Sequence, residues 1–258
     1  MTPRSNAVQA TGIAKLPQVT LAFWVMKISA TTLGETGGDL FSMTLKIGYV
    51  YSSIFLVVIL ACVLAGQLAA RRYIPVLFWS VILLTSTAGT TMSDMLDRTL
   101  HLGYPVGAAI LLSLLLAVFA IWRWTGEPFD VNRIRTRRVE LLYWTAILFS
   151  NTLGTAMGDF LSDSSGLGFK GGAMLVGGLI ALLGLAYAVT PISQTLLFWI
   201  AFVLTRPFGA EMGDALTKTH AKGGLGFGTA GSSLVLLDVL LAFVLYAQFR
   251  PAEEARQA

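Results

Sequence analysis

The sequence has few charged residues and almost no cysteine, and each shortage excludes a class of protein. Only 12% of its 258 residues are charged and 55% are hydrophobic, and the mean hydropathy of +0.72 lies far from that of soluble proteins. The single cysteine, Cys62, excludes a disulfide framework within the chain and a cysteine-based metal site. Metalloprotease, nucleophile-elbow and phosphate-loop motifs are also missing. This composition predicts an integral membrane protein.

Apolar runs fill most of the chain. Crossing a bilayer takes roughly 20 apolar residues, and runs of this kind lie at 18–42, 46–69, 74–97, 102–124, 139–163, 167–189, 194–217 and 225–248. We therefore predict an all-α membrane protein of eight transmembrane helices. Its predicted parts are a cytoplasmic tail (1–17), a first membrane half (18–124), a basic cytoplasmic loop (125–138), a second membrane half (139–248) and a second cytoplasmic tail (249–258).

Basic residues are concentrated on one side of the predicted spans. The positive-inside rule makes this side cytoplasmic, which predicts a multi-pass protein of the bacterial inner (plasma) membrane with both termini in the cytoplasm. The net charge of +4 does not indicate nucleic acid, because the basic residues lie in short loops where they set topology. The cytoplasmic set is Arg4, Lys15, Arg71, Arg72, Arg123, Arg133, Arg135, Arg137, Arg138, Arg250 and Arg256, and the opposite set is Lys46, Arg98, Lys170, Lys218 and Lys222.

One motif occurs four times in the chain. Each copy has an aromatic–Trp pair, a glycine ten residues after the Trp, and an aspartate five residues after the glycine. Because each copy covers two spans, all four enter the membrane in the same direction, which predicts four tandem helical hairpins with pseudo-fourfold or nested twofold symmetry. The pairs are Phe23-Trp24, Phe78-Trp79, Tyr143-Trp144 and Phe198-Trp199, the glycines are Gly34, Gly89, Gly154 and Gly209, and the aspartates are Asp39, Asp94, Asp159 and Asp214.

The first helix of each copy carries a polar stripe, because its polar residues are spaced three and four apart and share one helix face. Exposing such a face to lipid is costly, so we expect the stripes to point inward. Only two basic residues, Lys27 and Arg206, lie inside spans, against nine acidic residues in spans or at their ends. Unpaired carboxylates at this depth need protons or bound cations. The nine are Glu35, Asp39, Asp94, Asp97, Asp159, Asp163, Glu211, Asp214 and Asp238.

These residues make a candidate cation site. Oxygen ligands suit hard divalent cations, and methionines two residues before three of the aspartates add a softer sulfur that favours manganese. Two residues turn a continuous helix by about 200°, so sulfur and carboxylate meet only if the helix breaks. We predict kinks or breaks at Gly34, Gly89, Gly154 and Gly209, each of which stands two residues after Thr or Pro. The predicted metal ligands are Asp39, Asp94, Asp159, Asp214, Glu35, Glu211, Met92, Met157 and Met212, and the predicted proton-coupling or counter-ion residues are Lys27, Arg206, Asp97, Asp163 and Asp238.

Two resemblances to known families bear on function. Glu211-Met-Gly-Asp214 resembles the Glu-x-Gly-Asp core of the small manganese and calcium exchanger families, which implies movement of divalent cations. In those families Lys or Arg and then Thr or Ser follow the aspartate, whereas here Ala215 and Leu216 precede Thr217. Over all eight spans the chain resembles an uncharacterised bacterial family of multi-pass "membrane-anchored" proteins, a label that implies no function.

Structural roles would explain some of the same residues. Each aspartate of the motif would also serve to cap a helix, each glycine to let helices pack closely, and each aromatic–Trp pair to anchor the chain at the membrane interface. Lys27 and Arg206 are either fixed counter-ions of Glu35 and Glu211 or internal cations that are displaced during transport. The sequence leaves both alternatives open.

The function expected from these patterns is a secondary transporter or exporter of a divalent metal cation, with manganese favoured. The cation is expected as substrate, and no prosthetic group is predicted. The alternatives are a non-transport scaffold or signalling subunit, whose basic loop binds a partner or anionic lipid, and an exporter of a small organic cation. An intramembrane aspartyl protease needs a pair of aspartates, but its Gly-x-Gly-Asp sequence is missing, so no enzyme is expected. The expected partners are the lipid bilayer and the metal cation, and a homo-oligomer stays open.

Overall fold

The protein is all-helical, as predicted. The computed structural model describes residues 17, 19–127, 134 and 136–249, and each predicted run corresponds to one α-helix. The helices are α1 (Leu21–Asp39), α2 (Tyr49–Ala69), α3 (Pro75–Asp94), α4 (Tyr104–Trp124), α5 (Arg137–Asp159), α6 (Gly168–Val189), α7 (Gln194–Thr217) and α8 (Gly228–Phe249). Most of the two predicted tails and part of the basic loop lie outside the described residues, together with Arg4, Lys15, Arg133, Arg135, Arg250 and Arg256.

Local sequence signals explain where several helices begin. The Thr20 and Thr136 side chains accept hydrogen bonds from the backbone N–H groups of Phe23 and Val139, and so cap α1 and α5. Gly48 and Gly103 precede α2 and α4 with φ angles of 81° and 72°, which residues with a side chain rarely adopt. The recurring glycine before each of these helices therefore has a conformational cause.

Three of the odd-numbered helices end in a short π-helix. These segments are Leu40–Thr44, Met95–Thr99 and Phe160–Ser164, and each follows directly on an aspartate of the motif. The α-helices themselves run without interruption through Gly34, Gly89, Gly154 and Gly209. The predicted helix breaks at these four glycines are therefore wrong, and in three of the helices the irregular backbone starts six residues beyond the glycine. π-helical turns are frequent at functional sites.

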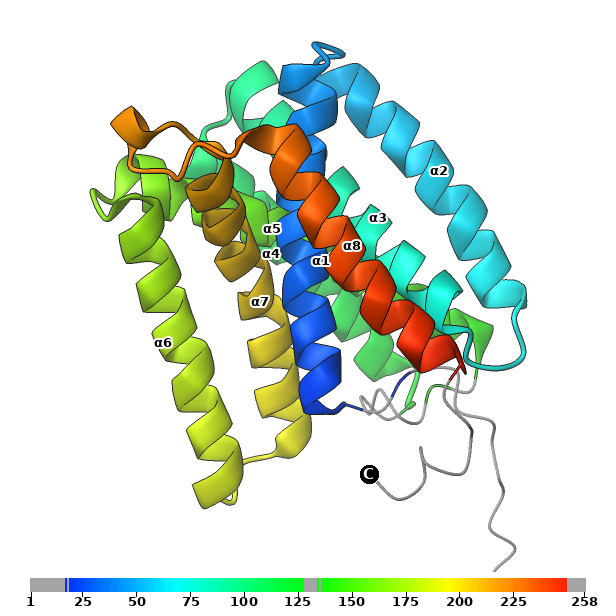
Figure 1. Ribbon diagram of the computed structural model, residues 1–258. Coiled ribbons are helices and arrows are strands. Elements are labelled where there is room, and N and C mark those ends of the chain that lie inside the picture. Colours follow the sequence, from blue (N-terminus) through cyan, green and yellow to red (C-terminus); the bar gives the residue numbers. More distant parts are fainter. Residues whose placement is uncertain (1–16, 18, 128–133, 135, 250–258) are drawn as a thin grey trace, which may run out of the picture.

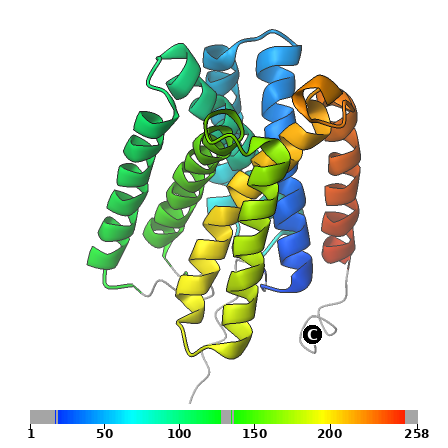
Figure 2. The same ribbon diagram turned by 90° about the vertical axis from the view of Figure 1, so that its left-hand side faces the viewer.

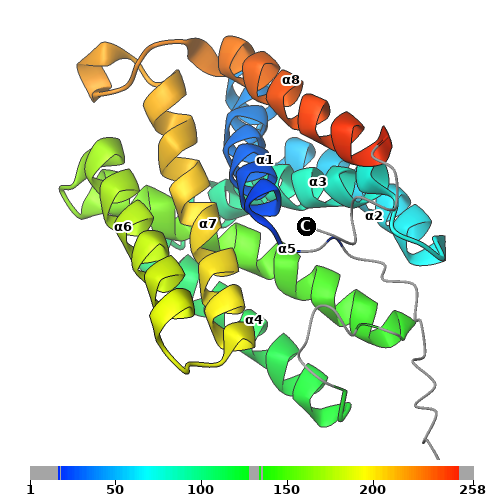
Figure 3. The same ribbon diagram turned by 60° about the horizontal axis from the view of Figure 1, so that its bottom comes forward.

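The odd-numbered helices form an inner ring. α1 contacts α3, α3 contacts α5, α5 contacts α7, and α7 contacts α1. The even-numbered helices lie outside this ring (Figures 1 and 3), with α2 packed along α3, α4 along α5, α6 along α7, and α8 along α1. The outer helix of each repeat thus packs chiefly on the inner helix of another repeat, and the last outer helix packs on the first inner one.

The outer layer has a membrane-protein surface. Of the helices in the described part of the chain, α2, α3 with its π-helical turn, α4, α6, α7 and α8 are long and apolar enough to cross a membrane. Large exposed apolar side chains such as Tyr51, Leu116 and Leu182 cover the outer helices. In Figures 1 and 2 the outer helices lie against the sides of the inner ones. These features support a multi-pass membrane protein.

The four glycines of the motif let the inner helices touch. A Cβ atom built on Gly34 would meet Ser86, one on Gly89 would meet Asn151, and one on Gly154 would meet Arg206. A Cβ atom on Gly209 would meet Thr31, which closes the ring. Each partner stands three residues before the glycine of its own helix. The packing role proposed for these glycines accounts for them, since small residues allow membrane helices to approach closely.

Replacing Gly209 by valine is expected to destabilise the protein by about 2–3 kcal/mol through overpacking. The added Cβ would lie 2.9 Å from the backbone carbonyl carbon of Thr31, and backbone cannot rotate away as a side chain can. Gly184→Val is the matched control, because a Cβ on Gly184 meets no atom within 4 Å. Thermal unfolding in detergent, followed by tryptophan fluorescence, compares the two. Equal melting temperatures would contradict this account of the inner ring.

Six of the eight side chains in the aromatic–Trp pairs are buried, and Trp24 and Phe198 are partly buried, so the predicted role as interfacial anchors is wrong for the pairs of repeats two and three. Phe78, Trp79, Tyr143 and Trp144 are at most 1% exposed and belong to one apolar core with Phe23. Their rings pack edge-on or tilted, with the centroids of Phe78 and Trp144 5.4 Å apart. Each pair lies near the start of an inner helix, so the four pairs fill the ring at that end. The anchoring prediction fails for these two pairs because protein, rather than lipid, surrounds the starts of α3 and α5.

Candidate functional site

The polar stripes face the interior, as predicted. Glu35, Asp39, Asp94, Asp159 and Asp214 are all buried, although each lies on a helix that the sequence places in the membrane. The four aspartates stand at or near the ends of the inner helices, at the end of the bundle opposite the aromatic core. We call Asp39, Asp94, Asp159 and Asp214 the aspartate cluster. None of the three aspartates that precede a π-helix caps it with its side chain, so the capping alternative does not explain these residues.

Two basic side chains bridge the aspartate cluster in pairs. The Lys218 ammonium lies 3.1 Å from Asp39 and 3.0 Å from Asp214. The Arg98 guanidinium lies 2.8 Å from Asp94 and 3.4 Å from Asp159. Each base thus joins the aspartate of its own helix to one on a neighbouring helix. The two bases are partly exposed, at 38% for the Arg98 side chain and 23% for that of Lys218, so they stand between the cluster and its surroundings.

Lys218 is held as a cation by the carboxylates it bridges. Burial alone lowers the pKa of its ammonium, but the charges of Asp214 and Asp39 outweigh burial and raise that pKa above its ordinary value. Lys218 follows the last residue of α7 and lies outside the span. It is therefore protonated at every physiological pH, and a metal cation at this position has to displace a permanent positive charge.

One corner of the cluster has the geometry of a cation site. Carboxylate oxygens of Glu35, Asp39 and Asp214 lie within 4.8 Å of one another. These residues belong to α1 and α7, the first and last helices of the inner ring. Three oxygens at this spacing suit a hard divalent cation, which takes 6–8 oxygen ligands if it is calcium. The other corner of the cluster is the one where Arg98 bridges Asp94 and Asp159. There Thr155 occupies the repeat position of Glu35, so this corner offers one carboxylate fewer.

Arg206 links the four inner helices at a level between the aspartate cluster and the aromatic residues at the other end of the bundle. Its side chain is fully buried, and the two N–H groups of Nη2 are shared among three acceptors within hydrogen-bonding distance, Glu35 at 2.8 Å, Thr155 at 2.6 Å and Thr90. These three acceptors come from α1, α5 and α3, and each follows directly on the motif glycine of its helix. One guanidinium thus holds all three other inner helices. Of the two glutamates considered as partners for Lys27 and Arg206, Glu35 is thus paired with Arg206.

Lys27 has no carboxylate partner among the described residues. Its buried ammonium donates to Asn151 Oδ1 at 3.5 Å and lies 4.0 Å from the centre of the Phe202 ring. Asn151 in turn donates to Thr85 at 3.0 Å. Lys27 is therefore not paired with either glutamate considered as its partner, because its ammonium faces Asn151 on α5, Glu35 binds Arg206, and the Glu211 carboxylate lies beside Gly172 on α6.

Several predicted site residues lie away from the aspartate cluster. The buried carboxylate of Glu211 faces Gly172 on α6, and that of Asp97 faces Gly107 on α4. Asp163 is exposed and accepts a hydrogen bond from Tyr104, and Asp238 is exposed on the outer helix α8. Only the aspartates of the motif and Glu35 are brought together.

The methionines do not contribute sulfur to the cluster. Met157 packs with the apolar residues that join α4 to α5, while Asp159 turns inward. The α-helices are continuous through Met92, Met157 and Met212, so each sulfur points about 200° away from its aspartate. The helix break that the sulfur ligands required is missing, and with it the structural ground for preferring manganese.

Arg98 and Lys218 belong to the candidate site, and the sequence interpretation missed them. Both were assigned to loops that set topology. Each stands four residues after the aspartate of its repeat, a spacing that puts two side chains on the same helix face and lets them pair. Met43 and Asp163 occupy the equivalent positions of repeats one and three. The sequence therefore already shows a basic residue at this position in repeats two and four alone.

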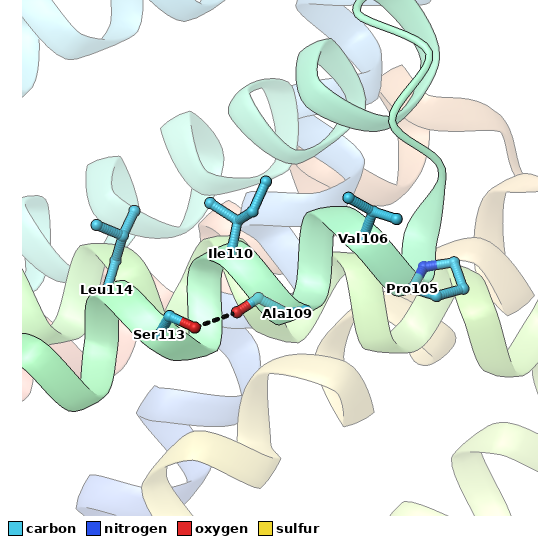
Figure 4. Close-up of a pocket in the computed structure, with 6 residues that line it drawn as sticks. All are labelled: Pro105, Val106, Ala109, Ile110, Ser113 and Leu114. Carbon is cyan, nitrogen blue, oxygen red and sulfur yellow. Dashed lines mark hydrogen bonds between the residues drawn. The ribbon is translucent and has the colours of Figure 1, made fainter.

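Two grooves on the outside of α4 are separate from this site. The first is lined by residues of α4 alone, from Pro105 to Leu114 (Figure 4), and its one drawn hydrogen bond joins Ser113 to the Ala109 carbonyl. The second runs between α4, α5 and α7 and is lined by apolar side chains including Met157 and Trp199. Neither contains a residue of the aspartate cluster, and both have the character of a lipid-facing surface.

Comparison with known proteins identifies the repeat. A family model described as Repeat of Unknown Function (DUF347) matches residues 22–73, 77–127, 142–192 and 197–253, which are the four copies found in the sequence. No curated protein and no solved structure matches the chain, and no comparison supports the resemblance to the exchanger families. The four matches cover most of the 258 residues. The chain therefore belongs to the DUF347 repeat family, with four copies of the repeat.

Proposed function

We propose that this protein transports a divalent metal cation, which binds at the aspartate cluster. The observation that carries the proposal is the convergence of four buried aspartates, one from each repeat, at one end of the inner ring. Ionisable groups at membrane depth are rare and mark ion pathways. The proposed first ligands are Glu35, Asp39 and Asp214, whose oxygens lie close together. Their all-oxygen set suits calcium, magnesium and manganese alike.

The charge of the cluster supports a divalent substrate. Four aspartates are balanced by one arginine and one lysine, which leaves two formal negative charges. Glu35 is neutralised separately by Arg206. A divalent cation offsets this negative charge, and leaving carboxylates unbalanced in a low dielectric costs several kcal/mol per group.

The proposed architecture has all eight helices crossing the bacterial inner membrane, with both termini cytoplasmic. The starts of the inner helices share one end of the bundle (Figure 1), where Arg71, Arg123 and Arg137 also lie. The closed ring of glycine contacts supports fourfold pseudosymmetry of the backbone. The two bases support a nested twofold axis, since Arg98 bridges from repeat two to repeat three and Lys218 from repeat four to repeat one. The cluster then opens away from the cytoplasm, while Arg206 and the aromatic core close the other side.

Uptake by proteoliposomes tests the proposal. Purified protein is reconstituted around an indicator dye, and entry of Mn²⁺ and of Ca²⁺ is followed. Asp39→Asn combined with Asp214→Asn is expected to lower the initial rate about tenfold, because the loss of two ligand charges is worth more than about 1.4 kcal/mol. The matched control is Glu127→Gln, which removes a carboxylate outside the helices and should leave the rate unchanged.

A structural role is the second candidate, because every aspartate of the cluster already has a basic partner. If the pairs serve only to hold the ring together, wild-type liposomes take up neither ion faster than empty ones. The double variant then shows its defect as a lower yield of monodisperse protein after detergent extraction. That combination of results would exclude transport through this site.

A further inference from the structure

Glu211 on α7 is a buried acid that takes no part in the ion pairs of the inner ring. Its side chain is 1% exposed, and both carboxyl oxygens are buried without a hydrogen-bond partner. Among the carboxyl groups that the structure describes, it is the only one with two such oxygens. A carboxylate that is buried without a donor or a base takes up a proton, because burying the neutral acid costs far less than burying the ion.

The charged groups around Glu211 favour the same neutral state. The charges that act on it belong to Asp214 on its own helix, Glu35 on α1 and Asp163 at the end of α5, and all three are negative. Negative neighbours disfavour a further negative charge. The bases on α7 and on the helices packed against it have other partners or are exposed: Arg206 binds Glu35, Lys218 binds Asp39 and Asp214, Lys27 faces Asn151, and Arg137, Arg138 and Lys170 are exposed.

The position of Glu211 is occupied by a neutral residue in the other three repeats. It stands three residues before the aspartate of the motif, where repeats one, two and three have Thr36, Thr91 and Ala156. At this position Thr36 accepts a hydrogen bond from Ser233 on the outer helix α8, and Glu211 faces Gly172 on the outer helix α6. The packing between inner and outer helix therefore does not require an acid here.

Glu211 also lies close to the end of the bundle where a proton can leave. A Cβ atom on Gly172 would overlap the Glu211 carboxyl group, and Gly172 stands four residues, about one helical turn, after the start of α6. Residues 163–167, which lead into α6, are all exposed. A proton on Glu211 is thus about one turn of helix away from exposed polar residues.

We propose that Glu211 exchanges a proton for the transported cation. It holds the proton while the cation site is empty, and it releases the proton to water at the exposed end of the bundle when a cation binds to Glu35, Asp39 and Asp214. This inference rests on the proposed cation transport. The negative charge of Asp214 helps to retain the proton in the empty site. A divalent cation brings more positive charge than the Lys218 ammonium that it displaces, so the proton leaves as the cation arrives.

Proton release during metal binding tests this role. Purified protein in weakly buffered detergent solution is titrated with Mn²⁺ and with Ca²⁺, a pH-indicator dye measures the protons released, and calorimetry measures the cation bound. The wild type should release about one proton more per cation than Glu211→Gln. This variant should still bind the cation, because Glu211 is not a proposed ligand. Glu127→Gln makes the same change outside the helices and should release as many protons as the wild type.

Infrared spectroscopy observes the proton itself. The carbonyl stretch of a protonated carboxyl group should be present in the metal-free wild type and weaken when metal is added, a comparison that needs no variant. If Glu211→Gln does not fold, Glu211→Thr replaces it, since threonine stands at this position in two other repeats. Cation binding with equal proton release by wild type and variant, or a carbonyl band that metal leaves unchanged, would overturn the role of Glu211 and leave cation transport standing. Absence of cation binding by both proteins would overturn cation transport, and the exchange with it.

Discussion

Replacing Arg206 by methionine is expected to lower the free energy of unfolding by about 3–5 kcal/mol, the usual effect of removing one partner of a buried ion pair. Arg206 is fully buried and donates to Glu35 at 2.8 Å. Without the guanidinium, the Glu35 carboxylate stays buried with an uncompensated charge. Thr90 and Thr155 also lose the donor that links α3 and α5 to α7. Methionine keeps most of the side-chain volume, so a cavity contributes little.

A second substitution separates the charge effect from a general packing defect. Adding Glu35→Gln to Arg206→Met removes the uncompensated charge, and we expect it to restore about half or more of the lost stability, because neighbours in one ion network are not additive. Arg123→Met is the matched control, since Arg123 is exposed at the end of α4, and its effect should be about 0.5 kcal/mol or less. Unfolding in detergent by a denaturant, followed by near-ultraviolet circular dichroism, measures these three variants and Glu35→Gln alone in the same buffer. A double variant as unstable as the two single changes added together would refute the pair.

The repeat and the spans were predictable because the membrane restricts what a chain can do. A helix that crosses lipid has to be apolar over a fixed length, so the limits of α7, at residues 194 and 217, could be placed from composition alone. The inward direction of the polar stripes followed from the same cost. Residues such as Thr31 and Asn151 are fully buried, because lipid offers them no hydrogen-bond partner.

The errors concern features that depend on which helix lies beside which. A glycine in a membrane helix serves either a bend or a close contact, and Gly209 could be assigned only once Thr31 was found beside it. In the same way, a Trp near the end of a span faces either lipid or protein. Trp79 and Trp144 face protein, because the outer helices pack across repeats and enclose the inner ring. The repeat can be identified in the sequence, but the sequence alone does not show which outer helix packs on which inner helix.

Substituting Lys218 by methionine is expected to lower the Kd for Mn²⁺ or Ca²⁺ about a hundredfold. The Lys218 ammonium lies 3.0 Å and 3.1 Å from two of the proposed ligands, and it has to leave when a cation arrives. The substitution abolishes this competition, and it also removes a positive charge that repels the bound divalent ion. At such distances the interaction of unit charges is about 4 kcal/mol near a protein surface, and partial exposure of Lys218 to solvent reduces this to about 2.7 kcal/mol, which corresponds to a hundredfold.

The role of Lys218 also separates transport from a purely structural site. Titration of the purified protein with each metal, followed by its melting temperature, gives the affinity of the wild type, of Lys218→Met and of the control Lys222→Met, which changes an exposed lysine of the same connection. If the cluster is a cation site, Lys218→Met is destabilised without metal and regains its melting temperature when metal fills the place of the ammonium. If Lys218 is only a fixed bridge, the same variant loses stability that neither ion restores, since Asp39 and Asp214 then repel each other in a geometry that no ion fits. Recovery by metal therefore requires that the oxygens of Glu35, Asp39 and Asp214 can hold a cation together.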